Sequence, residues 1–335
     1  MNKSIKIIAE IGVNHDGKLD KAIRLIDLAV SSGANAVKFQ SFKTELLAKI
    51  DTPKVEYQLR DLSSDTHYSM LKSLELSFSE QKTLIDYCKN KQIEFISTPY
   101  DVESARMLSK MGITTFKVAS ADIVDFNLLK CLRDCAQELI ISTGMSTLDE
   151  IDACLNTCSN SKVAITLLHC VSNYPCSENS LNLKVIPALR ERYKLPVGYS
   201  DHAESHFASA LAYTLGATIF ERHFTLDRHD PGPDHAASDN PNQFSEYVKG
   251  LRRTENLLGN SAKKVQSEEY QMRKISRKGL YWKGDKKNGE KVTVFDLICI
   301  RPAHGLSPMM IPNILGKRMR KNAKAGSPVK MDDIF

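Results

Sequence analysis

Residues 5–40 read IKIIAEIGVNHDGKLDKAIRLIDLAVSSGANAVKFQ, and this stretch decides the class of fold. Its two ends, 5–10 and 36–40, are short and apolar, as expected of buried strands. Between them, apolar residues recur at i, i+3, i+4 and i+7 over 19–30, and Gly33 follows as a helix stop signal. The stretch therefore predicts a strand–helix–strand unit.

The same alternation continues along the chain. Further strand-like runs fall at 94–98, 115–119, 138–142, 164–170, 197–200 and 218–223. Helical spacing falls at 79–92, 102–111, 127–136, 147–158, 183–193, 204–216 and 243–258, and a longer loop precedes the first of these. Eight such units in about 255 residues predict a (β/α)8 TIM barrel. A doubly wound open sheet is the competing fold, but no G-x-G-x-x-G turn follows the first strand.

The chain has 335 residues, about 85 more than a typical barrel of about 250. The alternation stops near Gly259, and 260–276 is polar and charged, as in a linker with some helix. From 277 to 335, short β-type runs at 279–282, 291–294 and 297–300 are separated by Gly, Asp and Pro. We therefore expect a catalytic barrel over 1–259, a linker over 260–276 and a small β-rich domain over 277–335.

Composition narrows the functional classes. The chain is 42% hydrophobic and 26% charged, as in soluble globular proteins, and no run of 18 apolar residues predicts a membrane span. The net charge of +6 suits an anionic small-molecule substrate. Binding to nucleic acid is the alternative, but the basic clusters at 249–291 and 317–324 contain no aromatic-interleaved motif.

Eight cysteines are too few for a disulfide scaffold in a chain of this length. Cys131 and Cys135, like Cys154 and Cys158, have the spacing of helix neighbours rather than of a zinc knuckle. The N-terminus lacks the long apolar core of a signal peptide. We expect reduced thiols in a cytoplasmic enzyme.

Polar residues gather at the carboxyl ends of the predicted strands, where barrel enzymes carry their active sites. In chain order they are Glu10, Lys38, Gln40, Thr98, Lys117, Ser120, Asp122, Ser142, Ser172, Tyr174, Ser200, His202, Glu221, His223 and, in a later loop, Asp234. Packing does not explain such a ring, because buried polar groups are costly unless they are paired.

Lys38 and Lys117 lie within apolar strands, where a lysine is costly without a counter-charge. With the nearby hydroxyls they would suit a phosphate or a carboxylate. The alternative is that each lysine pairs with a barrel carboxylate such as Glu10 or Glu221.

His202 and His223 end neighbouring strands and are a candidate pair of ligands for a divalent metal. Their spacing of 21 residues is not a short-range metal motif, so two hydrogen-bonded structural histidines are the alternative. No P-loop and no G-x-S-x-G elbow is present, which argues against P-loop phosphoryl transfer and an α/β-hydrolase.

Several short motifs occur in series along the chain. They are IAEIGVNHDG (8–17), VKFQ (37–40), STP (97–99), STGM (142–145), LHC (168–170), GYSDH (198–202), ERHFT (221–225), PGPDH (231–235) and, in the tail, IRPAHGLSP (300–308). Taken together, they resemble the sialic acid synthase family, the phosphoenolpyruvate-dependent nonulosonate synthases. The tail resembles the family's small C-terminal domain, which is like type III antifreeze protein (a SAF domain).

The resemblance implies that phosphoenolpyruvate condenses with an N-acylated mannosamine-type sugar and water. The products are a nine-carbon 2-keto acid, of the N-acetylneuraminate or legionaminate type, and phosphate. It implies a divalent cation, manganese or magnesium, on His202 and His223, with Glu10 as the third catalytic residue.

The resemblance also assigns substrate contacts. Lys38, Thr98, Lys117, Ser120, Ser142 and Ser200 match positions that hold phosphoenolpyruvate. Gln40, Asp122, Ser172, Tyr174 and Asp234 complete the substrate-binding set, and Ser172 stands where some members have Asn. Arg301 matches an arginine that reaches the sugar's N-acyl group from the other subunit, which implies a domain-swapped homodimer.

Two other functions compete with the synthase. A metal-dependent barrel isomerase or epimerase would use His202 and His223 without phosphoenolpyruvate. A sugar-phosphate binding protein would need neither the metal nor a base. The segment 234–238, DHAAS, is closer to synthases of N-acetylneuraminate or legionaminate than of pseudaminate, but the residues do not name the sugar.

Overall fold

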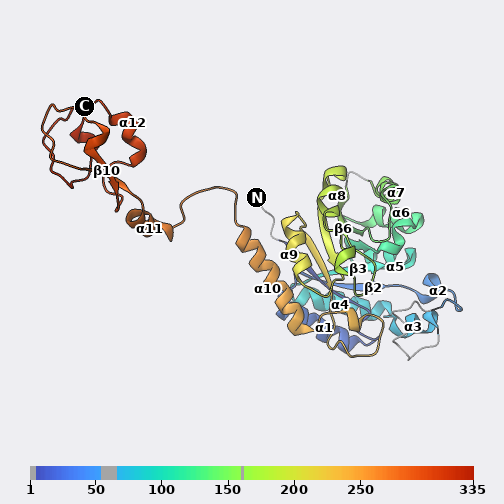
Figure 1. Cartoon of the computed structure of the whole chain (residues 1–335). Helices are drawn as coiled ribbons and strands as arrows, with labels where there is room; N and C mark the ends of the chain where they lie inside the picture. The colour runs from blue at the N-terminus through green and yellow to red at the C-terminus, as the bar shows by residue number, and fades with distance from the viewer. Residues whose placement is uncertain (1–4, 54–65, 160–161) are drawn as a thin grey trace. The chain divides into compact units, whose positions relative to one another are not determined.

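The computed structural model describes residues 5–53, 66–159 and 162–335. The chain divides into two compact units, Met1–Gly259 and Asn260–Phe335 (Figure 1). None of the helices in these described ranges combines the length and apolarity that crossing a bilayer requires.

The first unit is a closed barrel in which eight strands pair in sequence order and the last pairs with the first. Every pair is parallel, as the predicted TIM barrel requires. The strands are β1 Lys6–Gly12, β2 Ala36–Ser41, β3 Glu94–Pro99, β4 Thr115–Val118, β5 Glu138–Ser142, β6 Ala164–His169, β7 Val197–Asp201 and β8 Ile219–His223.

Eight helices surround the barrel, close to where the apolar spacing predicts them. They are α1 Leu19–Ser31, α4 Phe78–Asn90, α5 Val102–Lys110, α6 Phe126–Cys135, α7 Leu148–Cys158, α8 Val185–Tyr193, α9 Phe207–Thr214 and α10 Pro241–Leu258. Local sequence starts several of them: Ser77, Thr147 and Asn240 each form a capping box with the residue three positions on.

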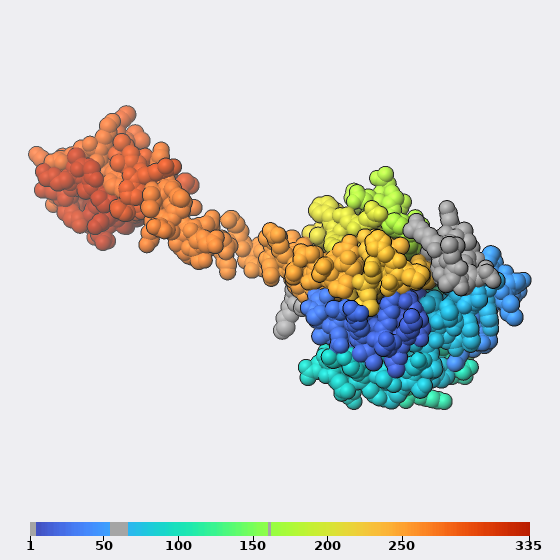
Figure 2. All heavy atoms as spheres, turned by 90° about the horizontal axis from the view of Figure 1, so that it is seen from below, coloured from blue at the N-terminus to red at the C-terminus, as the bar shows by residue number. Residues whose placement is uncertain are grey.

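The last helix closes the ring against the start of the chain. Arg252 of α10 donates to the Ile5 carbonyl at 2.9 Å and to Asn35 Oδ1 at 2.7 Å. The blue N-terminal elements and the yellow-orange segment before residue 260 accordingly lie side by side on one face (Figure 2).

The segment predicted as a long loop after β2 contains two helices, α2 Thr44–Leu47 and α3 His67–Leu74. Each is at most eight residues long, too short for helical periodicity to stand out from a loop. Thr66 caps α3 through the Ser69 amide, and α3 buries Met70, Leu71 and Leu74. Short 3-10 turns also occur, including Ser120–Val124 and His235–Ala237.

The barrel interior changes from apolar to polar along the strands. Its apolar layer consists of Ile8, Ala36, Ile96, Ile140, Leu168 and Ile219. Because strand side chains alternate between faces, the residues two positions on point inward as well. They are Glu10, Lys38, Thr98, Ser142, Cys170 and Glu221, all of them buried. The polar layer thus stands on an apolar floor at the carboxyl ends of the strands.

The second unit has its own core of Leu280, Trp282, Val292, Ile314, Met319, Val329 and Ile334. It contains α11 Glu269–Ser276, the antiparallel pair β9 Gly279–Trp282 and β10 Leu297–Ile300, and α12 Ile311–Ile314. The strand predicted at 291–294 is wrong. Lys291 makes only an isolated bridge to Arg318, because Thr293 instead donates twice to the Asp296 carboxylate and starts a 3-10 turn.

Candidate active site

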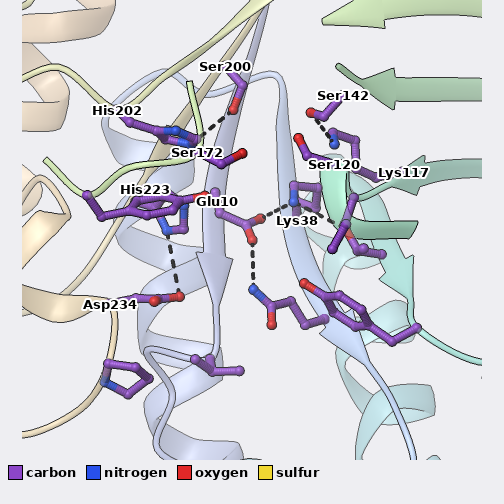
Figure 3. Close-up of a pocket in the computed structure, with 18 of the residues that line it drawn as sticks. Glu10, Lys38, Lys117, Ser120, Ser142, Ser172, Ser200, His202, His223 and Asp234 are labelled. Carbon is purple, nitrogen blue, oxygen red and sulfur yellow. Dashed lines mark hydrogen bonds and ion pairs between the residues drawn. The ribbon is translucent and has the colours of Figure 1, made fainter. Parts of the chain in front are cut away.

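A cavity of about 620 Å³ lies at the carboxyl ends of the barrel strands. The polar residues that line it include Glu10, Lys38, Gln40, Thr98, Lys117, Ser120, Ser142, Ser172, Tyr174, Ser200, His202, Glu221, His223 and Asp234 (Figure 3). Side chains from all eight strands, or from the loops that follow them, therefore converge on one space.

Two residues expected at the site do not line this cavity. Asp122 lies in the turn Ser120–Val124, and its Oδ2 is buried without a hydrogen-bond partner in the described structure. Arg301 belongs to the second unit, where it is exposed. Conversely, Glu221 lines the cavity, although it was not among the residues expected to bind substrate or act in catalysis. Strand alternation could have indicated its position, because Glu221 lies two residues after Ile219 of the apolar layer.

Glu10, Lys38 and Glu221 form a buried charge cluster. Lys38 Nζ lies 2.8 Å from Glu10 Oε2 and 3.6 Å from Glu221 Oε2, and it donates to Thr98 Oγ1 at 3.2 Å. Strand register brings them together, because Glu10 is paired with Lys38 on β2, and Ile8, two residues before Glu10, is paired with Glu221 on β8. Lys38 therefore has the barrel carboxylates as partners that the alternative interpretation expects.

The two carboxylates of this cluster differ in acidity. Burial raises the pKa of Glu10 to about 7, although Lys38 opposes the shift. Burial also acts on Glu221, but Lys38, Lys117 and a hydrogen bond from Ser200 outweigh it and hold the pKa of Glu221 below its usual range. Carboxyl groups whose pKa values are pushed apart can take different roles at one pH. Glu10 is the one suited to exchange a proton near neutrality.

Lys117 differs from Lys38, because no carboxylate in the described residues lies within ion-pair distance of it. Its Nζ donates to Ser142 Oγ at 2.6 Å and to the Val118 carbonyl at 2.8 Å. Burial lowers the pKa of Lys117. A buried cation without an anionic partner is costly, so an anion in the cavity would complete this arrangement.

Hydroxyls crowd around Gly144, beside Lys117. The Gly144 amide donates to Ser120 Oγ at 3.1 Å. A Cβ at Gly144 would overlap both Ser120 Oγ and Ser172 Oγ, so only glycine lets the backbone approach them. With Ser142, these groups form a cradle of hydroxyls suited to a phosphate.

His202 and His223 face the cavity side by side, with ring centroids 5.6 Å apart. His202 Nδ1 is 2.7 Å from the Val171 carbonyl, so it carries the proton and Nε2 presents a lone pair. His223 Nδ1 is buried and has no hydrogen-bond partner in the described structure; Asp234 Oδ2 lies 3.9 Å away. Burial lowers the pKa of both rings. Two neutral imidazoles with an orphaned nitrogen fit a divalent cation.

A second group able to hold a cation consists of Asp16, Asp230 and His235, whose ligand atoms lie within 4.8 Å of one another. Lys21 Nζ already lies 2.6 Å from each carboxylate, and His235 Nε2 lies 2.9 Å from Asp16 Oδ1. Because Lys21 supplies the positive charge there, we interpret this group as an ion-pair network that joins the loops after β1 and β8.

Sequence and structure comparisons place the chain among known proteins. The NeuB family model matches residues 25–263. The chain is 40% identical over 326 residues to the N,N'-diacetyllegionaminic acid synthase of Campylobacter jejuni, covering 96% of this chain and 98% of that protein. It is 38% identical over 334 residues to the protein of the same name from Legionella pneumophila, covering 98% and 94%.

The chain belongs to the NeuB family. A solved N-acetylneuraminic acid synthetase from Leptospira borgpetersenii, in complex with citrate, superposes with a TM-score of 0.71 at 34% identity, over 81% of this chain and 90% of that one. The protein is thus an enzyme of the sialic acid synthase type, a nonulosonate synthase, and the resemblance inferred from its motifs is confirmed. Family membership also favours the synthase over the isomerase and the binding protein.

Sequence reasoning missed the apolar part of this NeuB-family cavity. Val13, Leu47, Met70, Leu71 and Leu74 line it as well, together with His67 and Tyr100. Three of these leucine and methionine side chains come from α3, which the sequence did not predict.

Proposed function

We propose that this enzyme condenses phosphoenolpyruvate with the open-chain aldehyde of an N-acylated mannosamine-type sugar. C3 of phosphoenolpyruvate forms a bond to the aldehyde carbon, and the aldehyde oxygen gains a proton. Water adds at C2 and loses one proton. The resulting C2 hydroxyl loses its second proton as the bond between C2 and the phosphate oxygen breaks, which leaves a ketone and free phosphate. The observation that carries this proposal is Lys117, a buried cation without a carboxylate partner in the described residues, in a cavity that is also lined by hydroxyls and by two neutral imidazoles.

The proposal assigns phosphoenolpyruvate to Lys117, Ser120, Ser142 and Ser200, with Lys38 and Thr98 beside them. The lysines offset the charge of the phosphate and carboxylate, and the hydroxyls fix their orientation. Gln40, Ser172, Tyr174 and Asp234 would contact the sugar. Glu10 would hold or accept the proton of the attacking water, since its pKa lies near neutrality.

A divalent cation, manganese or magnesium, bound by His202 and His223 would polarise the aldehyde oxygen of the sugar. Tyr174 packs against both rings, with centroids 4.2 Å from His202 and 5.4 Å from His223, and would hold them in place.

Phosphate release tests the function directly. We expect phosphate only when phosphoenolpyruvate and an N-acylated amino sugar are both present, with a product whose mass is that of the nine-carbon acid. An isomerase would change the sugar without consuming phosphoenolpyruvate, and a binding protein would release nothing; either result contradicts the proposal.

Replacing His223 with alanine should weaken binding of Mn²⁺ by about 10-fold or more, since one of two nitrogen ligands is lost. Titration calorimetry with Mn²⁺ measures this without reference to turnover. His206→Ala is the control, because His206 lies outside the cavity and pairs with Asp239. Equal Mn²⁺ affinity in His223→Ala and the parent enzyme would remove His223 from the metal site.

We further propose that 277–335 is an antifreeze-like (SAF) domain that delivers Arg301 to the site of a partner subunit in a domain-swapped homodimer. Arg301→Ala should raise KM for the sugar by about 10- to 100-fold, the loss expected for one charge-assisted hydrogen bond. Arg320→Ala, at an exposed arginine of the same unit, is the control.

Mixing subunits separates a swapped from an unswapped dimer. Co-refolded His223→Ala and Arg301→Ala chains should recover activity, because one site per swapped heterodimer then holds both native residues. In an unswapped dimer each site keeps one defect, so no recovery would contradict the swap. We also propose that the reaction takes place in the cytoplasm.

A further inference from the structure

A buried charged network lies on the side of β7 and β8 that faces away from the cavity. Ser200 and Glu221 line the cavity, and because strand side chains alternate between faces, Asp201 and Arg222 point outward, towards α9 and α10. Together with Asp239, from the loop between β8 and α10, they form a group of three charged side chains that we call the clamp.

The Arg222 guanidinium uses all three of its nitrogens in the clamp. Nε donates to Asp239 Oδ2 at 3.1 Å and Nη2 donates to Oδ1 at 2.9 Å, which makes a bidentate pair. Nη1 donates to the Ala203 carbonyl and lies 3.3 Å from Asp201 Oδ1. Asp201 in turn accepts from the Ala203 amide at 3.0 Å and from Ser209 Oγ at 2.6 Å. The compact ammonium of a lysine cannot reproduce this planar fork.

Strand pairing between β7 and β8 ends just before the two histidines of the cavity. The last register pair places Asp201 opposite Arg222, one residue before His202 and His223 respectively. Both imidazoles then point into the cavity, with ring centroids 5.6 Å apart (Figure 3). The spacing of the two histidines therefore depends on contacts other than this strand pairing.

The clamp supplies such a contact beside each histidine. Ala203 follows His202, and its carbonyl accepts a hydrogen bond from Arg222. The Asp239 amide donates to the His223 carbonyl at 2.9 Å, and the Asp239 carboxylate is held by Arg222. One guanidinium thus links the backbone after His202 to the backbone beside His223.

Stability alone explains the clamp poorly. Taking charges out of water is costly, and a buried ion pair is often no more stabilising than apolar side chains of similar volume. Arg222 and Asp239 are each 4% exposed and Asp201 is 1% exposed, so all three are removed from water. What a bidentate pair adds is a fixed geometry. That geometry is useful next to two side chains whose separation matters.

We propose that Arg222 is a positioning residue for the metal site: with Asp201 and Asp239, it fixes the separation of His202 and His223 so that both can bind one divalent cation. The inference rests on the proposed function and adds to it a residue that lines no part of the cavity. Outer partners of metal ligands typically change metal affinity by about 10- to 100-fold when they are replaced.

Calorimetric titration of Arg222→Lys with Mn²⁺, in the absence of substrates, tests the proposal. The variant keeps the positive charge and loses the bidentate geometry. We expect the Kd for Mn²⁺ to rise by about 10-fold or more. Phosphate release should require a correspondingly higher Mn²⁺ concentration and approach the parent kcat at saturating Mn²⁺, because no reacting group has been removed.

Arg252→Lys is the matched control. Arg252 joins α10 to the start of the chain at the amino ends of the strands, opposite to the histidines. It should lose stability and keep the Mn²⁺ affinity of the parent. His206→Ala is a second control, since it removes one donor to Asp239 and leaves the bidentate pair with Arg222.

Asp239→Asn serves if Arg222→Lys does not fold. It keeps the side-chain volume and replaces one acceptor oxygen of the bidentate pair, while Asp201 still offsets the charge of Arg222. We expect the same rise in Kd for Mn²⁺.

An unchanged Mn²⁺ affinity in the folded clamp variant, whatever its stability, would overturn the inference and leave the metal site intact. So would a rise in Kd with no recovery of kcat at saturating Mn²⁺. A parent enzyme that binds no Mn²⁺, or a His223→Ala variant that binds it as tightly as the parent, would overturn the proposed metal site, and the inference with it.

Discussion

Replacing Lys117 with methionine should lower kcat/KM for phosphoenolpyruvate by about 100-fold or more and leave the protein at least as stable as before. Lys117 is 2% exposed, and its hydrogen bonds go to Ser142 Oγ and the Val118 carbonyl, not to a carboxylate. Methionine has a similar volume, and its introduction removes a buried charge together with the desolvation cost that this charge imposes on the folded state. The substrate, in contrast, loses a cation that would contact its phosphate or carboxylate.

Thermal unfolding and initial rates over a range of phosphoenolpyruvate concentrations measure the two effects. Lys6→Met is the control: Lys6 Nζ lies 2.8 Å from Glu94 Oε2 at the amino ends of the strands, away from the cavity. It should keep its rate and gain no stability. A Lys117→Met variant that keeps its rate and loses stability would show that this lysine serves the fold.

Replacing Glu10 with glutamine should lower kcat by about 100- to 10,000-fold, the range for loss of a positioned acid–base group. Gln cannot accept the proton that the carboxylate would take from water. Burial places the pKa of Glu10 at about 7. Since the acceptor must be unprotonated, the parent rate should rise with pH through that value and level off above it.

The pH profile distinguishes this role from a structural one. The residual rate of Glu10→Gln should lack the rise near neutrality, because the titrating group is gone. Glu94→Gln, which removes a carboxylate at the opposite end of the barrel, should keep both rate and profile. An unchanged rise in Glu10→Gln would assign that titration to another group.

Much of the fold and the site could be predicted from local patterns. The pairs Ile8/Glu10, Ile140/Ser142 and Ile219/Glu221 each place an apolar floor residue two positions before a polar one. Strand periodicity is a local property, so the sequence was enough to place the polar ring at the strand ends. Asp122 shows where this reasoning stops, because a 3-10 turn after β4 replaces the regular alternation there.

The apolar side of the cavity, formed by Val13, Leu47, Met70, Leu71 and Leu74, could not be predicted for a related reason. α3 is eight residues long and is held in position by residues that are distant in sequence. Thr44 Oγ1 donates a hydrogen bond to Glu75, and the missing side chain at Gly17 leaves space for the Ser73 carbonyl. A short helix owes its stability to tertiary packing, not to its own sequence pattern. Its four cavity-lining residues, His67, Met70, Leu71 and Leu74, could therefore be recognised only in the folded chain.

The sequence by itself determined the barrel, the position of the polar layer and the family, because each depends on residue type and spacing along the chain. Only the tertiary structure decided that Lys38 has two carboxylate partners while Lys117 has none among the described residues, and that Glu10 and Glu221 differ in acidity. The physical reason is that ion pairing and desolvation depend on distances between strands and on depth from solvent. Strand register sets those distances and burial sets that depth. Neither register nor burial is a property of a single strand.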